Sequence, residues 1–259
     1  MDYKSLALEV VKIAEAAGER IMEIYNAAEG ITYDKKTDNS PLTQADTEGN
    51  TIICNALKKL NVQFPIISEE NKLLPYDERK NYDHFWLVDP LDGTKEFIKR
   101  NGEFTVNIAL VKGRHPVMSV VSAPTLNETY WAVKGLGAFL IKDGETTQLN
   151  ANEFTMKDDG LGVVCSRSHL NQETQDFIDK LSNPTKVSIG SSLKFLILAK
   201  GGAHVYPRIA PTMEWDTAAA QMILEAAGGK VVRLDDGKPL LYNKENLLNP
   251  YFIAYGNVQ

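Results

Sequence analysis

The sequence predicts a mixed protein of the α/β (α+β) class, and three patterns indicate it. Apolar residues at three- and four-residue spacing predict a long amphipathic helix at the start of the chain. Short β-rich runs separated by turn residues follow, which favours a largely antiparallel sheet. After about Gly144 strand and helix patterns alternate, as is typical of an α/β arrangement. We therefore predict two halves, residues 1–144 and 145–259.

The first half is predicted to contain two helices and then the antiparallel sheet. The inward positions of the first helix are Leu6, Val10, Ile13, Ala17, Ile21 and Ile24. A second helix is expected from about Thr43 to Leu60. The predicted strands are Phe64–Ser68, Phe85–Val88, Phe104–Val111, Val117–Ala123, Glu128–Val133 and Ala138–Ile141.

The second half is predicted to alternate between strands and helices. Its strands are expected at Leu161–Cys165, Lys186–Ile189, Ala203–Tyr206 and Lys230–Arg233. Its helices are expected at Asn171–Leu181, Ser191–Lys200 and Trp215–Ala227. Gly228 and Gly229 would close the last of these helices, because glycine tolerates the left-handed backbone that ends many helices.

The composition argues against the binding of a nucleic-acid polymer. Of 259 residues, 43% are hydrophobic and 24% charged, which is ordinary for a soluble globular protein. With 28 Lys and Arg against 34 Asp and Glu the formal net charge is −6, so we expect no nucleic-acid polymer as a partner. A small anionic substrate remains compatible with that balance, since a local site can be positive when the whole molecule is negative.

The chain is expected to be cytoplasmic. Cys54 and Cys165 are too few for a disulfide framework and are interpreted as reduced, buried thiols. The N-terminal segment contains several acids and no unbroken apolar stretch, so we expect no signal peptide. No apolar run approaches the ~20 residues that span a bilayer, so no integral membrane association is expected.

The segment WLVDPLDGTKEF, residues 86–97, directs carboxylates to one point at the end of an apolar strand. Pro90 has a fixed φ and disfavours helical backbone at Asp89, so the strand is expected to end there. Gly93 permits a turn directly after Asp92. Asp89 and Asp92 can then point to one spot.

Clustered carboxylates need protonation, a basic partner or a metal ion, because an isolated buried carboxylate is very costly. Lys95 and Lys99 are candidate partners, whereas a divalent cation would satisfy several carboxylates at once. Glu69 and Glu70 also follow an apolar strand, and Asp216 opens an Ala-rich helix. Each feature alone is more often a turn, a solvated pair or a helix start. Together, with all-oxygen ligands and scattered histidines, they predict Mg²⁺ rather than Zn²⁺.

The motifs resemble those of a known enzyme family. WLVDPLDGTKEF, SEE at Ser68–Glu70 and EWDTAAA at Glu214–Ala220 resemble the inositol monophosphatase superfamily of Mg²⁺-dependent, lithium-sensitive phosphatases. KEF at Lys95–Phe97, GSSLKF at Gly190–Phe195 and SRSH at Ser166–His169 are similar to its 3′(2′),5′-bisphosphate nucleotidase branch. The resemblance extends from SPLTQAD at Ser40–Asp46 to the C-terminal strand. It implies a layered αβαβα sandwich and a place in sulfur metabolism.

The resemblance also implies roles for individual residues. The implied metal ligands are Glu69, Asp89, Asp92, Asp216 and the carbonyl of Leu91, holding two or three Mg²⁺ ions. Asp46 and Thr94 are implied to orient and deprotonate the attacking water. The expected substrate contacts are Glu69, Leu91, Asp92, Gly93, Thr94, His169, Ser191, Lys194, Arg208 and Asp216. Ser191 and Lys194 also form a plausible anion site on residue chemistry alone, although an ordinary helix cap is the commoner explanation.

The predicted reaction is hydrolysis of the 3′-phosphate of adenosine 3′,5′-bisphosphate to AMP and phosphate. The sulfated precursor, 3′-phosphoadenosine 5′-phosphosulfate, is a further expected substrate. The alternatives are an inositol or sugar phosphatase that uses the same metals, and a non-catalytic metal or nucleotide sensor. The pair Thr94 and Asp46 argues against a sensor, which needs no water-activating groups. The sequence contains no P-loop, which removes NTPase readings.

Overall fold

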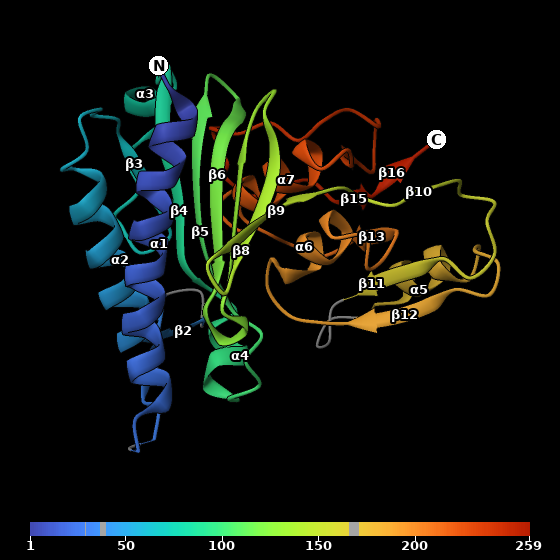
Figure 1. Ribbon diagram of the computed structural model, residues 1–259, viewed down its shortest axis with the longest axis horizontal. Helices are drawn as coiled ribbons and strands as arrows, with labels where there is room; N and C mark the ends of the chain where they lie inside the picture. The colour runs from blue at the N-terminus through green and yellow to red at the C-terminus, as the bar shows by residue number, and fades with distance from the viewer. Residues whose placement is uncertain (29, 37–39, 166–170) are drawn as a thin grey trace.

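Two β-sheets and the helices that cover them form five layers in the computed structural model (Figure 1), which describes residues 1–28, 30–36, 40–165 and 171–259. The helices α1 (Tyr3–Asn26) and α2 (Gln44–Leu57) cover one face of a seven-stranded sheet. Between that sheet and a five-stranded sheet lie α6 (Leu193–Ala199) and α7 (Ala218–Ala226). The outer face of the second sheet packs on α5 (Gln172–Ile178). The expected αβαβα sandwich is confirmed.

The seven-stranded sheet is antiparallel except at one edge. In spatial order its strands are β3 (Ile66–Ser68), β4 (His84–Asp92), β5 (Thr105–Lys112), β6 (His115–Ala123), β7 (Glu128–Val133), β8 (Gly137–Lys142) and β9 (Glu145–Leu149). Only β3 and β4 run parallel. The sequence pattern does not predict β9, because four of its five residues are exposed and show no apolar alternation. The predicted antiparallel block is otherwise confirmed.

The five-stranded sheet is mixed. Its strands in spatial order are β12 (Thr185–Ser188), β11 (Gly162–Cys165), β13 (Val205–Arg208), β15 (Phe252–Tyr255) and β14 (Lys230–Arg233). The remaining described elements are β1 (Tyr33–Lys35), β2 (Pro41–Thr43), α3 (Tyr76–Arg79), α4 (Thr94–Ile98), the 3₁₀ helix η1 (Pro124–Leu126), β10 (Glu153–Phe154) and β16 (Asn257–Val258). The division between residues 144 and 145 stays a prediction.

Helix α7 is buried on nearly all sides because both sheets pack on it. Met222, Ile223 and Leu224 are at most 4% exposed, and burial of one such side chain contributes about 1.5–3 kcal/mol. The same apolar cluster includes Phe85 of β4 and Phe252 of β15. The core therefore fixes the N-terminal end of α7 relative to both sheets, and this end is where the candidate site lies.

The prediction that the strand ends before Pro90 is wrong. Strand β4 continues to Asp92, and its pairing with β5 shifts register between Asp89 and Asp92. Proline has no N–H for the ladder, and a bulge leaves residues unpaired, so Pro90 is tolerated there. Bulges redirect side chains and are frequent beside active sites.

The prediction that the last helix begins at Trp215 is also wrong. Helix α7 begins at Ala218 with Thr217 as its N-cap residue, so Asp216 precedes the helix. The backbone N–H of Met213 donates to Oδ2 of Asp216 at 2.9 Å. Such a local side-chain bond stabilises a turn in competition with helix.

Among the described residues, none of the helices has both the length and the apolar character that crossing a membrane requires.

Candidate active site

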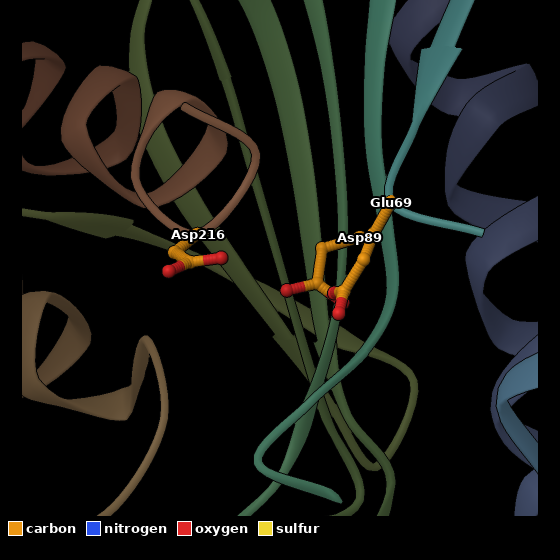
Figure 2. A group of neighbouring side chains, drawn as sticks. All are labelled: Glu69, Asp89 and Asp216. Atoms are coloured by element: carbon orange, nitrogen blue, oxygen red, sulfur yellow. The ribbon is translucent and has the colours of Figure 1, made fainter. Parts of the chain in front are cut away.

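Three carboxylates from separate parts of the chain converge at one end of the seven-stranded sheet (Figure 2). Glu69 follows β3, Asp89 lies in β4 and Asp216 precedes α7. One oxygen of each lies within 4.8 Å of the others. Figure 2 shows Asp89 between Glu69 on the sheet side and Asp216 on the side of α7. The structure thus brings together three of the four predicted acidic metal ligands.

The fourth predicted acid, Asp92, belongs to the same electrostatic cluster. Burial raises the pKa of Asp92 to about 6. Burial also raises the pKa of Asp89 and of Asp216 well above their usual range, and repulsion from Glu69 and Asp92 adds to both shifts. These directions mean that the site disfavours negative charge as it stands. A group of positive charge would remove that penalty.

The turn after β4 needs a glycine at position 93. Gly93 has φ +101°, in the region that side chains rarely adopt. A Cβ atom there would lie 2.8 Å from the carbonyl oxygen of Glu103. Gly93 thus joins Asp92, the last residue of β4, to Thr94, the first residue of α4. The DG dipeptide is therefore required by space as well as by backbone conformation.

The predicted catalytic pair is in contact. Oγ1 of Thr94 donates to Oδ1 of Asp46 at 3.0 Å and also lies 3.3 Å from the carbonyl oxygen of Leu91. Oδ2 of Asp46 accepts from the backbone N–H of Thr43 at 2.7 Å and from its hydroxyl at 2.6 Å. Asp46 is 1% exposed, and burial raises the pKa of its carboxyl against the effect of these hydrogen bonds.

Sequence reasoning missed Thr43 and Lys36, which contact residues of this site. Thr43 forms a capping box with Asp46 at the start of α2, and the spacing of these two residues in the sequence could have revealed it. Lys36 places Nζ 2.7 Å from Glu69 and 2.5 Å from Glu70. Nothing in the sequence indicates that contact. The predicted partners Lys95 and Lys99 form no ion pair with the described residues.

The donor set fits Mg²⁺. The donors that the described residues bring together are carboxylate oxygens of Glu69, Asp89 and Asp216, without histidine or cysteine. Hard oxygen donors with several negative charges select Mg²⁺ over softer metals. The N–H of Leu91 donates to Oδ1 of Asp89 at 3.0 Å, which orients that carboxylate. The protein thus prepares an oxygen-lined site in which Lys36 pairs with Glu69, while Asp89 and Asp216 form no ion pair with a described residue.

A cavity of about 160 Å³ lies beside the acids, and its lining includes Asp92, Asp216, Ser191, Lys194 and Arg208. Burial lowers the pKa of Lys194 to about 8, although Asp92 opposes the shift. Nε of Arg208 is buried and has no hydrogen-bond partner among the described residues, while Nη2 donates to the carbonyl of Pro211 at 2.9 Å. Arg208 lines the cavity, and a guanidinium group there suits an anionic ligand.

The loop before α6 differs in detail from the predicted anion site. The N–H of Gly190 donates to Oε2 of Glu103 at 2.8 Å. This backbone donor therefore binds a carboxylate of the protein itself. Ser191 and Lys194 remain at the cavity with Arg208. The predicted contact His169 lies outside the described residues.

The family model described as the inositol monophosphatase family matches residues 2–254. The 3′(2′),5′-bisphosphate nucleotidase CysQ of Salmonella typhimurium is 43% identical over 245 residues, 94% of this chain and 97% of the relative. The protein of the same name from Escherichia coli K12 is 42% identical with the same coverage.

Solved structures agree with these sequence comparisons. The crystal structure of CysQ from Bacteroides thetaiotaomicron, described as a bacterial member of the inositol monophosphatase family, has a TM-score of 0.86 and 42% identity. The match covers 100% of this chain and 99% of that one. An inositol monophosphatase from Thermotoga maritima has a TM-score of 0.77 at 25% identity, covering 99% and 93% of the two chains. The chain therefore belongs to the inositol monophosphatase family.

Proposed function

We propose that the protein is a Mg²⁺-dependent 3′(2′),5′-bisphosphate nucleotidase that hydrolyses the 3′-phosphate of adenosine 3′,5′-bisphosphate to AMP and phosphate. The observation that supports this proposal most is a cavity whose lining contains both acidic and basic side chains. Its lining includes the acids Asp92 and Asp216 and the cations Lys194 and Arg208. A substrate with two phosphates matches this arrangement, since one can approach the acids through metal ions and the other can pair with cations. The names of the relatives point to the same substrate class.

The residues that would hold the metal are Glu69, Asp89, Asp92, Asp216 and the carbonyl of Leu91. We propose two or three Mg²⁺ ions. When bound, Mg²⁺ lowers the pKa of a coordinated water molecule and neutralises charge on the phosphoryl oxygens. The raised pKa values of Asp89 and Asp216 support this proposal, because they express the cost of these charges without a counter-ion.

Thr94 and Asp46 are proposed to orient and deprotonate the attacking water. The Thr94 hydroxyl gives its proton to the hydrogen bond with Asp46, so its lone pairs are left to accept a proton from water. Burial makes the Asp46 carboxylate more basic than an exposed one, which suits a group that accepts a proton during the reaction. The capping box prevents Asp46 from rotating away.

The second phosphate is proposed to contact Ser191, Lys194 and Arg208. Lys194 lies 5.7 Å from the centre of the Tyr206 ring and is largely enclosed, so water screens its charge little. Glu69, Leu91, Asp92, Gly93, Thr94 and Asp216 are proposed to border the phosphate that is cleaved. His169 stays a prediction for the adenine side.

The proposed function includes two finer points. The sulfated nucleotide 3′-phosphoadenosine 5′-phosphosulfate has the same 3′-phosphate, so we propose that it is converted to adenosine 5′-phosphosulfate. That substrate would place the enzyme in sulfur metabolism. We also propose sensitivity to lithium, as the motif resemblance implies.

A phosphate-release panel tests the proposed function. Purified protein is assayed with adenosine 3′,5′-bisphosphate, inositol 1-phosphate and fructose 1,6-bisphosphate, each in Mg²⁺ and in excess EDTA. The expected result is highest kcat/KM for the nucleotide and loss of all activity in EDTA. Preference for either sugar phosphate would assign the protein to another branch of the family. Tight nucleotide binding without phosphate release in Mg²⁺ would indicate a sensor.

A further inference from the structure

Three polar side chains near the proposed metal ligands form hydrogen bonds to the loop that contains Ser191. Thr105 and Asn107 lie two residues apart in β5 and therefore on one face of the strand, and Glu103 lies two residues before the strand begins. Oε2 of Glu103 accepts from the N–H of Gly190 at 2.8 Å. Thr105 and Asn107 both contact the hydroxyl of Ser192, each at 2.8 Å.

The contacts among Thr105, Asn107 and Ser192 close a ring. The Ser192 hydroxyl donates to Oδ1 of Asn107, and Nδ2 of Asn107 donates to Oγ1 of Thr105 at 3.3 Å. Since Ser192 has only one hydroxyl proton, the remaining bond is donated by Thr105 to Ser192. All three residues are at most 1% exposed. Each side-chain oxygen and nitrogen of this buried ring has a hydrogen-bond partner, so breaking one bond leaves a buried polar group less satisfied.

The loop that the ring holds has a strained backbone. Ser191 has φ +47°, which is rare for a residue other than glycine. At Gly190 an added Cβ atom would lie 2.8 Å from Cγ of Glu96 and 3.1 Å from both Cβ and the carbonyl oxygen of Glu103. Strained backbone persists only where its surroundings fix it, and it often occurs at ligand sites. Here the surroundings that fix it are Glu103 and the ring.

The same strand fixes the metal ligands. In the pairing of β4 with β5, Asn107 lies opposite Asp89 and Thr105 lies opposite Asp92. One short stretch of β5 therefore contacts both the acids and the loop with Ser191, which leads directly into Lys194 at the start of α6.

We propose that Glu103, Thr105 and Asn107 are positioning residues that set the spacing between the metal site and the second phosphate site, and thereby make the enzyme selective for nucleotides with two phosphates. This inference rests on the proposed function. It assigns to these residues no contact with the reacting phosphate. Their removal should weaken the grip on the retained phosphate and spare the chemical step.

The test compares two substrates with Thr105→Val, which keeps the shape of the side chain but removes the hydroxyl. Adenosine 3′,5′-bisphosphate has both phosphates, whereas 3′-AMP has only the one that is cleaved. We expect KM for the bisphosphate to rise about tenfold with kcat within about twofold, and both constants for 3′-AMP to stay within about twofold. The inhibition constant of AMP, which has only the retained phosphate, should rise about tenfold as well.

A second pair of variants guards against misfolding. Glu103 is partly exposed, so Glu103→Ala should fold, and it should reproduce the effect of Thr105→Val. Glu103→Gln retains an acceptor oxygen for Gly190 and should restore KM for the bisphosphate. Thr129→Val is the matched control, since Thr129 is a buried threonine in β7 whose hydroxyl contacts that of Ser122 at 3.5 Å. This variant should leave kcat and KM unchanged for both substrates.

The outcomes separate the two levels of the argument. If wild type releases no phosphate from the bisphosphate, the proposed function fails and the positioning proposal fails with it. If wild type is active but Thr105→Val and Glu103→Ala change both substrates equally, or change neither, only the positioning proposal is overturned. Equal effects would indicate a structural role for the ring.

Discussion

The hydroxyl of Thr94 donates to Oδ1 of Asp46 at 3.0 Å, although the two residues lie in the first turns of different helices, α4 and α2. The second oxygen of Asp46 is occupied by Thr43. Both carboxylate oxygens are therefore engaged, and Thr94 links this fixed acid to the proposed metal ligand Leu91, whose carbonyl oxygen lies 3.3 Å from the Thr94 hydroxyl.

Thr94→Val is expected to lower kcat by roughly 10²- to 10⁴-fold, the usual contribution of proton transfer by a positioned side chain. Binding of Mg²⁺ should change little, because valine keeps the volume and the Leu91 carbonyl stays in place. Steady-state kinetics and calorimetric titration with Mg²⁺ measure the two quantities. Thr94→Ser is the control and should retain most activity. A Thr94→Val enzyme with near-normal kcat would remove Thr94 from the proposed role.

Asp92→Asn is expected to reduce turnover at least ~10²-fold, since an amide cannot replace the negative charge that the metal ions need. Without metal the same change should raise Tm, because it removes one of several repelling buried charges. Activity assays and thermal melts in EDTA measure both effects. Asp77→Asn at an exposed position should leave both unchanged. An Asp92→Asn enzyme that cleaves the substrate normally would show that the metal site is assigned wrongly.

Metal-free protein is expected to lose stability as pH rises. Burial raises the folded-state pKa of Asp92 to about 6, and those of Asp89 and Asp216 well above their usual value. The folded state then retains protons that the unfolded state releases. The resulting stabilisation is complete below the unfolded-state pKa. It is lost as pH rises through about 6 for Asp92, and at higher pH for the other two.

Added Mg²⁺ should therefore stabilise the protein more at high pH than at low pH. Thermal melts in EDTA and in MgCl₂ are recorded at about pH 5 and about pH 8. We expect the increase in Tm that MgCl₂ produces to be larger at about pH 8 than at about pH 5 by roughly 5 °C. A constant difference across this range would mean that the carboxylates are not the groups that the metal stabilises.

Gly93→Ala is expected to destabilise the fold by ~1–3 kcal/mol and to lower kcat, because its Cβ would clash with the carbonyl of Glu103 and move Asp92 and Thr94. Gly113→Ala is the matched control, since Gly113 also has positive φ but no atom within 4 Å of an added Cβ. It should cost about 1 kcal/mol and leave kcat unchanged. Chemical unfolding and kinetics separate the two variants. Equal kcat for both would contradict the argument.

Much of the fold could be predicted because its signals are local. The apolar spacing from Leu6 to Ile21 marks the buried face of α1, and these residues are buried in the structure. The alternation of strand and helix after Gly144 predicts the second sheet. Local signals fail where tertiary contacts decide, as at Pro90, where a bulge lets β4 continue, and at Asp216, whose bond to Met213 delays the helix.

The acids, the glycine turn at Gly93 and the membership of a phosphatase family can be predicted from the amino-acid sequence, because short contiguous motifs encode each of them. The contacts of Lys36 with Glu69 and of Thr105 with Ser192 depend on the folded arrangement of the chain. Residues far apart in the chain meet according to the order of strands and the packing of the layers. No local pattern encodes that order, because it results from burying the apolar faces of all the elements at once.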